Sequence, residues 1–418
     1  MNVLFLTLSR VSHIEERTIY ADLMRKFRDE GHQVYVVSPS ERRLGLKTSL
    51  SDENGVHILN VKTLNVQKTN VIEKGIGTLL LEWQYRSAIQ KYLKDINFDL
   101  IIYSTPPITF TNVVKYMKKR NPEAVSYLLL KDIFPQNAVD LGIFSEKSFF
   151  YRYFRKKEKA LYQASDYIGC MSPANVDYLR LHNQYYQKWR IEEAPNSIEL
   201  RSEHLDHIDK NAIRAKYGLP VDKPIFIYGG NLGKPQGIDY LISCLDDNKY
   251  REDCFFVIVG SGTEYHRLEA WIEAQRQTQG LENGRSLSVK VMKGLPKEEY
   301  DQLVQACDVG LIFLDHRFTI PNYPSRLLSY LENKMPVICA TDVNTDIGRI
   351  AEKNGYGYWC QSTNSVYFTV LINRFLSNPE RIKTMGERGY EYLKKNYLVG
   401  NTYRTIMRHC LKNENIYL

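Results

Sequence analysis

Short apolar runs alternate with amphipathic segments along this chain, starting at its first residues. Residues 2–8 form a continuous apolar run, which is typical of a strand buried in a parallel sheet. Residues 18–30 have the apolar spacing of a helix, Gly31 follows them, and residues 32–37 predict the next strand. Strand, helix and strand in this order make a βαβ unit, so the pattern predicts an α/β fold with parallel sheets.

The alternation runs to about residue 195 and starts again at Pro224. The first series predicts further strands at 58–64, 98–103, 125–130, 166–170 and 190–195, and helices at 71–93 and 149–162. The second series predicts strands at 224–228, 254–260, 288–292, 309–314, 337–340 and 357–359. Its predicted helices begin near residue 238 and span 297–306, 366–376, 378–395 and 402–410.

The segment 201–222 between the two series is polar and charged, and we interpret it as a linker. The chain is therefore expected to hold two βα domains that face each other across a cleft, which is a favoured ligand site. We expect the first domain at 1–200 and the second at 201–395. A helix at about 396–418 could pack back on the first domain.

Composition and charge narrow the class of protein. The net charge of +8 favours an anionic partner, such as a nucleotide, a lipid phosphate or an acidic membrane surface. Seven dispersed cysteines without a C-x-x-C pair are typical of reduced core thiols in a cytosolic protein. The chain start lacks the basic region and cleavage site of a signal peptide, and no apolar stretch reaches the ~18 residues of a membrane span.

A glycine-rich loop, 229–237, follows the first strand of the second series. It is not a P-loop, because Lys234 is followed by proline, and the loop after the chain's first strand lacks the G-x-G-x-x-G pattern of NAD or FAD sites. Gly229 and Gly230 nevertheless let a ligand approach the backbone, and Lys234 could reach a phosphate. The alternative is a tight turn with a solvated lysine.

The segment 319–340 predicts a polar loop, a helix of about three turns and a strand. Pro324 suits the first turn, and the free N–H groups of residues 325–327 together with Arg326 would form a positive helix end. Ser325, Ser329 and Glu332 share one helix face. This arrangement suits a nucleoside diphosphate, with the phosphates at the helix start and the ribose at Glu332. The alternative is an amphipathic helix that only covers a sheet.

The segment 149–162 (FFYRYFRKKEKALY) combines aromatic and basic residues. One interpretation is a surface helix that meets acidic lipid headgroups, with aromatic rings at the interface. The alternative is a helix packed on the sheet with a solvated basic face.

Taken together, several motifs carry a resemblance to a known family. In chain order they are KDIFPQNAVDLGIF (131–144), APNSIEL (194–200), YGGNLGKPQG (228–237), VIVGSGTE (257–264), KGLPKEEYDQLVQACDVGLIF (293–313) and PSRLLSYLENKMPVI (324–338). The chain resembles the retaining glycosyltransferases of family 4, in particular the bacterial members that assemble capsule and O-antigen polysaccharides. The resemblance implies two Rossmann-like domains (the GT-B fold), an N-terminal acceptor domain and a C-terminal nucleotide-sugar donor domain.

The resemblance implies a donor site with two departures from the family pattern. Glu332 matches the second glutamate of the E-x7-E motif, which holds the donor's ribose, but Pro324 stands where the first glutamate would be. The usual Arg and Lys of the glycine loop fall at Asn231 and Gln236.

We therefore expect Lys234 and Arg326 to supply the charge at the donor diphosphate. The backbone at Lys293 and Gly294 would meet the base, and Asn322 and Tyr323 would lie near the sugar. The expected donor-binding residues are Gly229, Gly230, Asn231, Lys293, Gly294, Asn322, Tyr323, Ser325 and Glu332, with Lys234, Arg326 and Asp132 as catalytic residues.

On the acceptor side, Asp132 matches the acidic position of the family's [RK]-D-[ILV]-[WF]-P segment. His13 and Glu16 belong to the first βα loop, which borders the acceptor in such enzymes. The alternatives are that Asp132 only caps a helix or pairs with Lys131, and that His13 is a surface loop residue.

The implied activity is transfer of a sugar, with retention, from a UDP-linked donor to a hydroxyl of a polyprenyl-diphosphate-linked saccharide. Such an enzyme is expected to be cytoplasmic and peripheral at the inner face of the cell membrane. It needs no cofactor or metal, because side-chain cations take that role and no D-x-D pair lies in a suitable loop; no nucleic-acid partner is expected. The alternatives are a nucleotide-sugar epimerase of the GT-B fold and a non-catalytic partner subunit, which the missing glutamate suggests.

Overall fold

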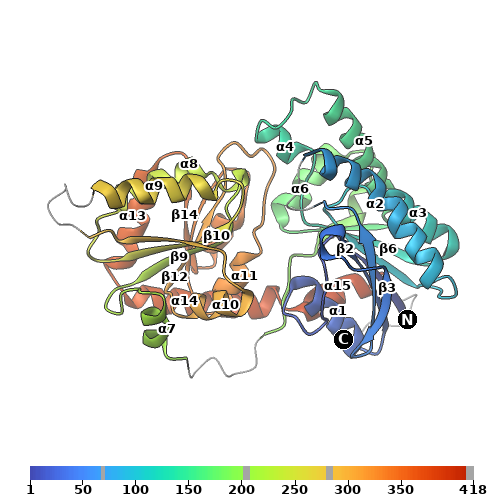
Figure 1. Ribbon diagram of the computed structural model, residues 1–418, viewed down its shortest axis with the longest axis horizontal. Helices are drawn as coiled ribbons and strands as arrows, with labels where there is room; N and C mark the ends of the chain where they lie inside the picture. Colours follow the sequence, from blue (N-terminus) through green and yellow to red (C-terminus); the bar gives the residue numbers. More distant parts are fainter. Residues whose placement is uncertain (67–70, 201–207, 279–285, 411–418) are drawn as a thin grey trace. The chain divides into compact units, whose positions relative to one another are not determined.

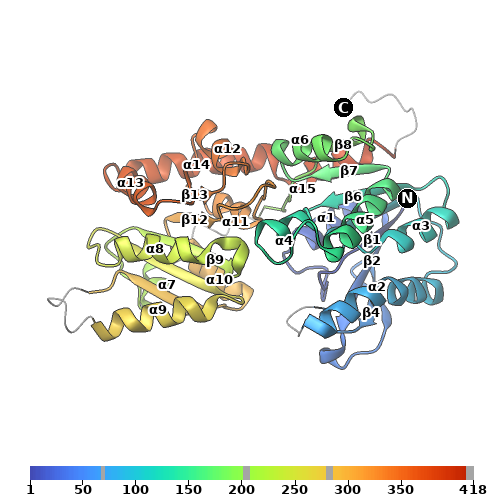
Figure 2. The same cartoon turned by 90° about the horizontal axis from the view of Figure 1, so that it is seen from above.

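The computed structural model describes residues 1–66, 71–200, 208–278 and 286–410. The chain divides into two compact units, one made of Met1–Glu199 with Tyr397–Leu418 and the other of Leu200–Asn396. Each unit has one mainly parallel sheet with helices on both faces (Figures 1 and 2). The prediction of an α/β protein with two parallel-sheet domains is confirmed.

The N-terminal unit is built on an eight-stranded sheet of order β3-β4-β2-β1-β5-β6-β7-β8. All neighbours are parallel except β3, which runs antiparallel to β4. The strands are β1 (Asn2–Leu6), β2 (Gln33–Glu41), β3 (Ser49–Glu53), β4 (Val56–Thr63), β5 (Leu100–Ser104), β6 (Val125–Leu130), β7 (Tyr167–Cys170) and β8 (Ile191–Glu193).

Most helices of this unit lie between its parallel strands in sequence, and the last one follows the C-terminal unit. They are α1 (Ile19–Asp29), α2 (Val71–Tyr92), α3 (Thr111–Arg120), α4 (Gln136–Asp140), α5 (Phe149–Ala164), α6 (Pro173–His182) and α15 (Val399–Met407), with short 3₁₀ turns η1 (Arg42–Leu44) and η2 (Lys188–Arg190). Thr18 begins α1 by accepting a hydrogen bond from the Ala21 N–H, as an N-cap residue does. None of the helices in the described ranges is both long and apolar enough to cross a membrane.

Helix α15 returns the end of the chain to the N-terminal unit. Its residues Ile406 and Met407 join the apolar core under α1, and the Tyr403 ring lies 5.0 Å from that of Phe27. Just before it, Leu398 forms a parallel bridge with Ile198. The segments that lead into and out of the C-terminal unit therefore lie side by side.

The C-terminal unit has a six-stranded sheet of order β11-β10-β9-β12-β13-β14, and all of its strands are parallel. The strands are β9 (Ile225–Asn231), β10 (Phe255–Ser261), β11 (Val289–Lys293), β12 (Val309–Phe313), β13 (Val337–Thr341) and β14 (Gly357–Gln361). This order places the start of the chain's second series, β9, in the middle of the sheet, which is typical of doubly wound folds.

Helices cover both faces of this sheet. They are α7 (Lys210–Lys216), α8 (Ile238–Asn248), α9 (Tyr265–Thr278), α10 (Lys297–Gln305), α11 (Arg326–Glu332), α12 (Ile347–Lys353), α13 (Ser365–Leu376) and α14 (Glu380–Asn396), with the 3₁₀ turn η4 (Lys234–Gln236). Figure 1 shows α8 and α9 on one face and α10, α11 and α14 on the other.

The segment 201–222 is not a plain linker. Residues 201–207 lie outside the described residues, but 210–216 form α7, whose N-cap Asp209 accepts hydrogen bonds from two N–H groups of the first turn. The buried Arg214 donates to the Ala306 carbonyl at 2.8 Å and pairs with Asp308 at 2.7 Å. That part of the linker prediction is wrong, because this buried contact holds a polar segment in a helix. Of the helix predicted at 396–418, residues 411–418 also lie outside the described ranges.

Close packing between β12 and α11 generates a stability prediction. A Cβ at Gly310 would lie 2.3 Å from the ring of Tyr330, which is fully buried and cannot move away. We expect Gly310→Ala to lower the free energy of unfolding by about 1–3 kcal/mol, measured by urea unfolding. Gly400→Ala in α15 is the control, because no atom lies within 4 Å of the added Cβ. Equal destabilisation of the two variants would contradict the packing argument.

Candidate active site

The glycine loop lies at the carboxyl edge of the C-terminal sheet, and its first three residues, 229–231, are the last three of β9. A Cβ at Gly229 would be 2.1 Å from the hydroxyl of Tyr300. Gly230 has a φ of +127°, which favours glycine, and a Cβ there would lie 3.5 Å from the guanidinium of Arg326. The packing of Tyr300 against Gly229 and the positive φ of Gly230 therefore favour glycine at both positions, and of the two Gly230 is exposed.

Two amide side chains hold the rest of the glycine loop together. The buried Gln236 accepts hydrogen bonds at its Oε1 from Asn231 Nδ2 at 3.2 Å and from the Gly233 N–H at 3.1 Å. These are the positions where the resemblance places an Arg and a Lys. Because the two amides bond to each other and carry no charge, a cation for a donor phosphate has to come from elsewhere. Lys234, which begins η4, is exposed in the same loop.

Arg326 places such a cation beneath the glycine loop. Its guanidinium carbon lies 4.2 Å from the ring centroid of Tyr228, a cation–π contact. Its Nη1 is buried and has no hydrogen-bond partner among the described residues. Burial acts to lower the pKa of Arg326, but the nearby Tyr228 and Tyr330 outweigh it and the pKa is raised. A charged donor with unused capacity thus faces the open backbone at Gly230.

Three tyrosines that the sequence did not single out surround this guanidinium. Tyr228 donates from its hydroxyl to the Asn231 carbonyl at 2.7 Å, and the Tyr330 hydroxyl accepts from the Gly229 N–H at 3.2 Å. Burial raises the pKa of Tyr300 to about 12, so its hydroxyl is neutral near pH 7. The sequence did hold clues to these tyrosines: Tyr228 directly precedes the glycine pair, and Tyr300 and Tyr330 lie on α10 and α11.

The helix start predicted at Pro324 is wrong by two residues. Helix α11 begins at Arg326 and has seven residues, about two turns and not three. The Leu327 N–H donates to the Pro324 carbonyl at 3.3 Å, and the Leu328 N–H donates to Ser325 at 3.1 Å. The Leu327 N–H is therefore not free for an anion, and Arg326 is the main source of positive charge here.

The predicted polar face of α11 is present, but its members differ in exposure. Ser325 is exposed, the Ser329 Oγ is buried without a hydrogen-bond partner in the described part of the chain, and Glu332 is only 4% exposed. The Ser329 hydroxyl and the Glu332 carboxylate therefore lie along a buried side of the helix.

The remaining donor-site candidates also lie after strands of this sheet. Lys293, the last residue of β11, is exposed and pairs in register with Gly260, and Gly294 follows it. In the loop before α11, the Asn322 N–H donates to Thr345 Oγ1 at 3.0 Å, and Tyr323 is partly buried. Since carboxyl ends of parallel strands share one edge, these residues and the glycine loop lie at the same edge.

Asp132 lies in the N-terminal unit, after β6. Asn137 Nδ2 donates to both carboxylate oxygens, at 2.8 and 3.0 Å, and burial raises the pKa of Asp132 to about 6. Lys131 donates instead to the Ala194 carbonyl at 3.2 Å, and burial lowers its pKa to about 7. The alternative in which Asp132 pairs with Lys131 is therefore not what the structure has. A carboxyl that titrates near neutral pH is suited to acid–base chemistry.

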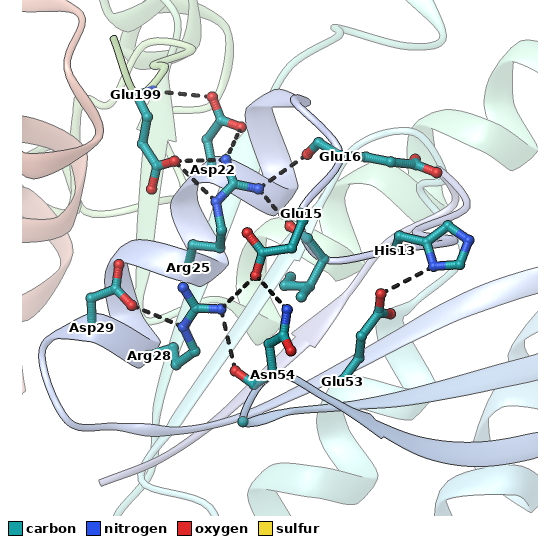
Figure 3. Close-up of polar contacts among 12 residues, drawn as sticks. His13, Glu15, Glu16, Asp22, Arg25, Arg28, Asp29, Glu53, Asn54 and Glu199 are labelled. Carbon is teal, nitrogen blue, oxygen red and sulfur yellow. Dashed lines mark hydrogen bonds and ion pairs between the residues drawn. The ribbon is translucent and has the colours of Figure 1, made fainter. Parts of the chain in front are cut away.

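The first βα loop is held by a network of ion pairs (Figure 3). The exposed His13 lies 3.0 Å from Glu53 of β3, while Glu15 pairs with Arg28 at 3.0 Å. The Glu16 carboxylate is directed away from this network, and its backbone carbonyl accepts a hydrogen bond from Arg25 at 3.1 Å. His13 and Glu16 thus lie at the carboxyl end of β1, and His13 has a structural partner.

Arg25 is the centre of that network. It pairs with the buried Asp22 at 2.7 Å and with Glu199 at 2.6 Å, and it also donates to the Ile14 carbonyl (Figure 3). Glu199 is the last residue of the first segment of this unit. One arginine therefore orders both the candidate acceptor loop and the end of that segment.

Comparison with known proteins identifies the class of the C-terminal unit. Residues 209–392 match the family model described as "Glycosyl transferases group 1". The probable glycosyltransferase WbjE of Pseudomonas aeruginosa is 22% identical over 277 residues, covering 65% of this chain and 64% of that protein. WcaI of Escherichia coli K12, assigned to colanic acid biosynthesis, is 29% identical over 162 residues, covering 38% and 37%. The matches thus span less than two thirds of either relative.

Solved structures show the same fold over nearly the whole chain. A sucrose-phosphate synthase from Thermosynechococcus elongatus aligns with a TM-score of 0.71 at 16% identity, covering 98% of this chain and 100% of that one. The Anabaena protein HepE in complex with UDP aligns with a TM-score of 0.64 at 15% identity, covering 98% and 99%. The chain therefore has the GT-B fold. The segment that is similar to group 1 glycosyl transferases, residues 209–392, lies within the C-terminal unit.

The raised pKa of Asp132 leads to a pH-dependent stability prediction. Because its folded pKa of about 6 exceeds the ordinary 3.8, the carboxyl's contribution to stability falls as pH rises through that interval and is constant above it. We expect Asp132→Asn to gain stability relative to wild type between those pH values, measured by urea unfolding across pH. Asn137→Ala removes the two hydrogen bonds from the Asn137 amide, which lower the Asp132 pKa. The pH range over which stability falls should therefore move upward in this variant. A difference that does not depend on pH would contradict the prediction.

Proposed function

We propose that this protein is a glycosyltransferase that transfers a sugar from a UDP-linked donor to a hydroxyl of a lipid-diphosphate-linked saccharide. The observation that carries the proposal is Arg326, whose buried, unpartnered nitrogen faces the open backbone at Gly230. A cation with unused donors beside a bare backbone suits a diphosphate. The group 1 domain match and the UDP bound by HepE support the same assignment.

In the proposed donor site, the diphosphate contacts Arg326 and Lys234. Arg326 offers a planar fork for two phosphate oxygens, and the exposed Lys234 adds a mobile point charge. As the bond from the anomeric carbon to the phosphate oxygen breaks, negative charge grows on the leaving diphosphate, and both cations stabilise it. In this proposal side chains supply the charge that a metal provides in other transferases.

The other donor groups have separate proposed roles. Glu332 accepts hydrogen bonds from the ribose hydroxyls, and the backbone at Lys293 and Gly294 contacts the base. Asn322 and Tyr323, in the loop before α11, lie near the sugar. Ser325 donates to a phosphate oxygen from the exposed start of α11.

We further propose retention of anomeric configuration, as in family 4. The acceptor hydroxyl attacks the anomeric carbon on the face that the diphosphate leaves, and its proton passes to the departing phosphate oxygen. Asp132 orients the acceptor through a carboxyl whose pKa is about 6, with Glu16 and His13 at the border of the acceptor site. The relative WcaI, assigned to colanic acid biosynthesis, supports the proposed role in polysaccharide synthesis. The location proposed for this role is the inner face of the cell membrane.

The donor-site proposal predicts that Arg326→Ala lowers transfer by about 100-fold or more while the fold is kept. Arg326→Lys should restore only part of the rate, because it keeps the charge but loses the fork. Glu332→Ala should also reduce transfer severely and weaken binding of UDP. The control is Lys334→Ala, an exposed lysine just past α11 that pairs with Glu387. Rates and UDP-induced thermal shifts are measured together, and wild-type turnover in either active-site variant would overturn the assignment.

The acceptor proposal predicts transfer to a polyprenyl-diphosphate-linked saccharide in a donor screen followed by mass spectrometry. The product should keep the donor's anomeric configuration by NMR, and Asp132→Asn should lower turnover while leaving the UDP-induced thermal shift unchanged. Conversion of UDP-sugar without an acceptor would instead indicate an epimerase. A protein that binds no nucleotide would favour the non-catalytic partner subunit that Pro324, Asn231 and Gln236 suggest.

A further inference from the structure

Three large apolar side chains are exposed at one end of the N-terminal unit. Ile143 is 60% exposed, Phe149 70% and Phe150 62%. They belong to the loop between α4 and α5 and to the first turn of α5, which projects from the top of this unit in Figure 1. We call the segment 143–159 with these side chains the aromatic tip. Side chains of this size are exposed together only rarely without a partner.

Hydrogen bonds and ring contacts hold the aromatic tip in a defined conformation. The Ile143 N–H donates to the Ala138 carbonyl at 2.8 Å, and the Ser148 hydroxyl caps α5 by accepting from the Tyr151 N–H at 3.1 Å. Beneath it, the rings of Phe134, Phe144 and Phe154 pack with centroids 5.0–6.5 Å apart. The loop and the helix start are thus fixed, and they hold Phe149 and Phe150 outward.

Positive charge accompanies these apolar side chains. The segment 143–159 contains six Lys and Arg against two Glu, a net charge of +4 within a chain whose total is +8. One of the two acids, Glu158, is buried and paired with Arg155. The exposed cations are Lys147, Arg152, Lys156 and Lys159. Arg152, Lys156 and Lys159 follow each other at i, i+4 and i+7, so they form one row along α5.

The geometry points to the aromatic tip as a docking surface for an anionic phospholipid bilayer. Phe149, Phe150 and Ile143 insert at the boundary between headgroups and acyl chains, and the row of cations contacts the lipid phosphates. The start of α5 projects from this unit in Figure 1, which suits insertion into a soft surface. This inference goes beyond the proposed reaction, and vesicle binding tests it without any donor or acceptor.

The test is co-sedimentation of the whole protein with vesicles of phosphatidylcholine alone or mixed with phosphatidylglycerol. We expect binding to the mixed vesicles, little to the neutral ones, and loss of binding as salt rises. Each cation at an anionic surface contributes about 1 kcal/mol, so Arg152→Gln with Lys156→Gln should lower the partition coefficient about 30-fold. Phe149→Ser with Phe150→Ser should lower it about tenfold or more, because less apolar area is buried.

The C-terminal unit offers matched control variants for both changes. Val366 and Tyr367 are consecutive, 59% exposed each, and lie in the first turn of α13 as the phenylalanines do in α5. Arg349 and Lys353 are exposed and four residues apart on α12, the spacing of Arg152 and Lys156. The same serine and glutamine substitutions there should leave vesicle binding unchanged.

Circular dichroism of each variant checks that it is folded. Loss of vesicle binding by a folded variant then reports on the substituted side chains. If the control variants lost vesicle binding to the same extent, the aromatic tip would not be the binding site. If the protein bound neutral vesicles equally well, the cations would have no role in binding. No sedimentation with any vesicle would overturn the proposal in favour of an acidic protein partner. The sugar-transfer assay is independent: with a soluble acceptor that lacks a lipid, the aromatic-tip variants should keep wild-type rates.

Discussion

The guanidinium of Arg326 lies on the ring of Tyr228, and its buried Nη1 has no hydrogen-bond acceptor in the part of the chain that the structure describes. Taking an ion out of water costs several kcal/mol, and a desolvated cation–π contact recovers only about 2 kcal/mol. The surrounding tyrosines bond to the backbone of β9, not to the cation's free nitrogen. A bound anion would remove this deficit. The glycine pair and the tyrosines pack around this guanidinium, which is carried by the first residue of the short helix α11.

The N-terminal unit has the opposite electrostatic character at its candidate site. There the partly buried carboxyl of Asp132 accepts hydrogen bonds from the Asn137 amide, and desolvation raises its pKa to about 6. A neutral or weakly charged group of this kind can bind a sugar hydroxyl without the strong hydration of a free carboxylate. The candidate residues of the two units thus differ in charge: the C-terminal unit offers a cation, and the N-terminal unit offers a carboxyl with a raised pKa.

Strand pattern predicted the fold because buried parallel strands give continuous apolar runs that little else produces. Polar contacts were harder to predict. Asn231 and Gln236 looked like lost phosphate ligands, but folded they bond to each other. Helix α11 begins later than predicted, because the Leu327 N–H donates to the Pro324 carbonyl in the turn before it. Helix α7 lies in a segment predicted as linker, because its buried Arg214 pairs with Asp308. His13 and Glu53, forty residues apart in sequence, meet only once β3 is paired with β4. The contacts that the sequence did not predict join residues that are far apart in the chain or that meet only in the folded backbone conformation.

The position of α15 has a consequence for synthesis of the protein. The apolar face of α1 is completed by Ile406, Met407 and Tyr403, which follow the whole C-terminal unit in the chain. During translation, residues 1–199 leave the ribosome long before these residues, while the C-terminal unit has all of its strands once residue 361 is made. Domains usually fold as units in the order of synthesis. Here the unit that begins the chain is the last to be finished, and until then its uncovered helix face is a surface that chaperones can bind.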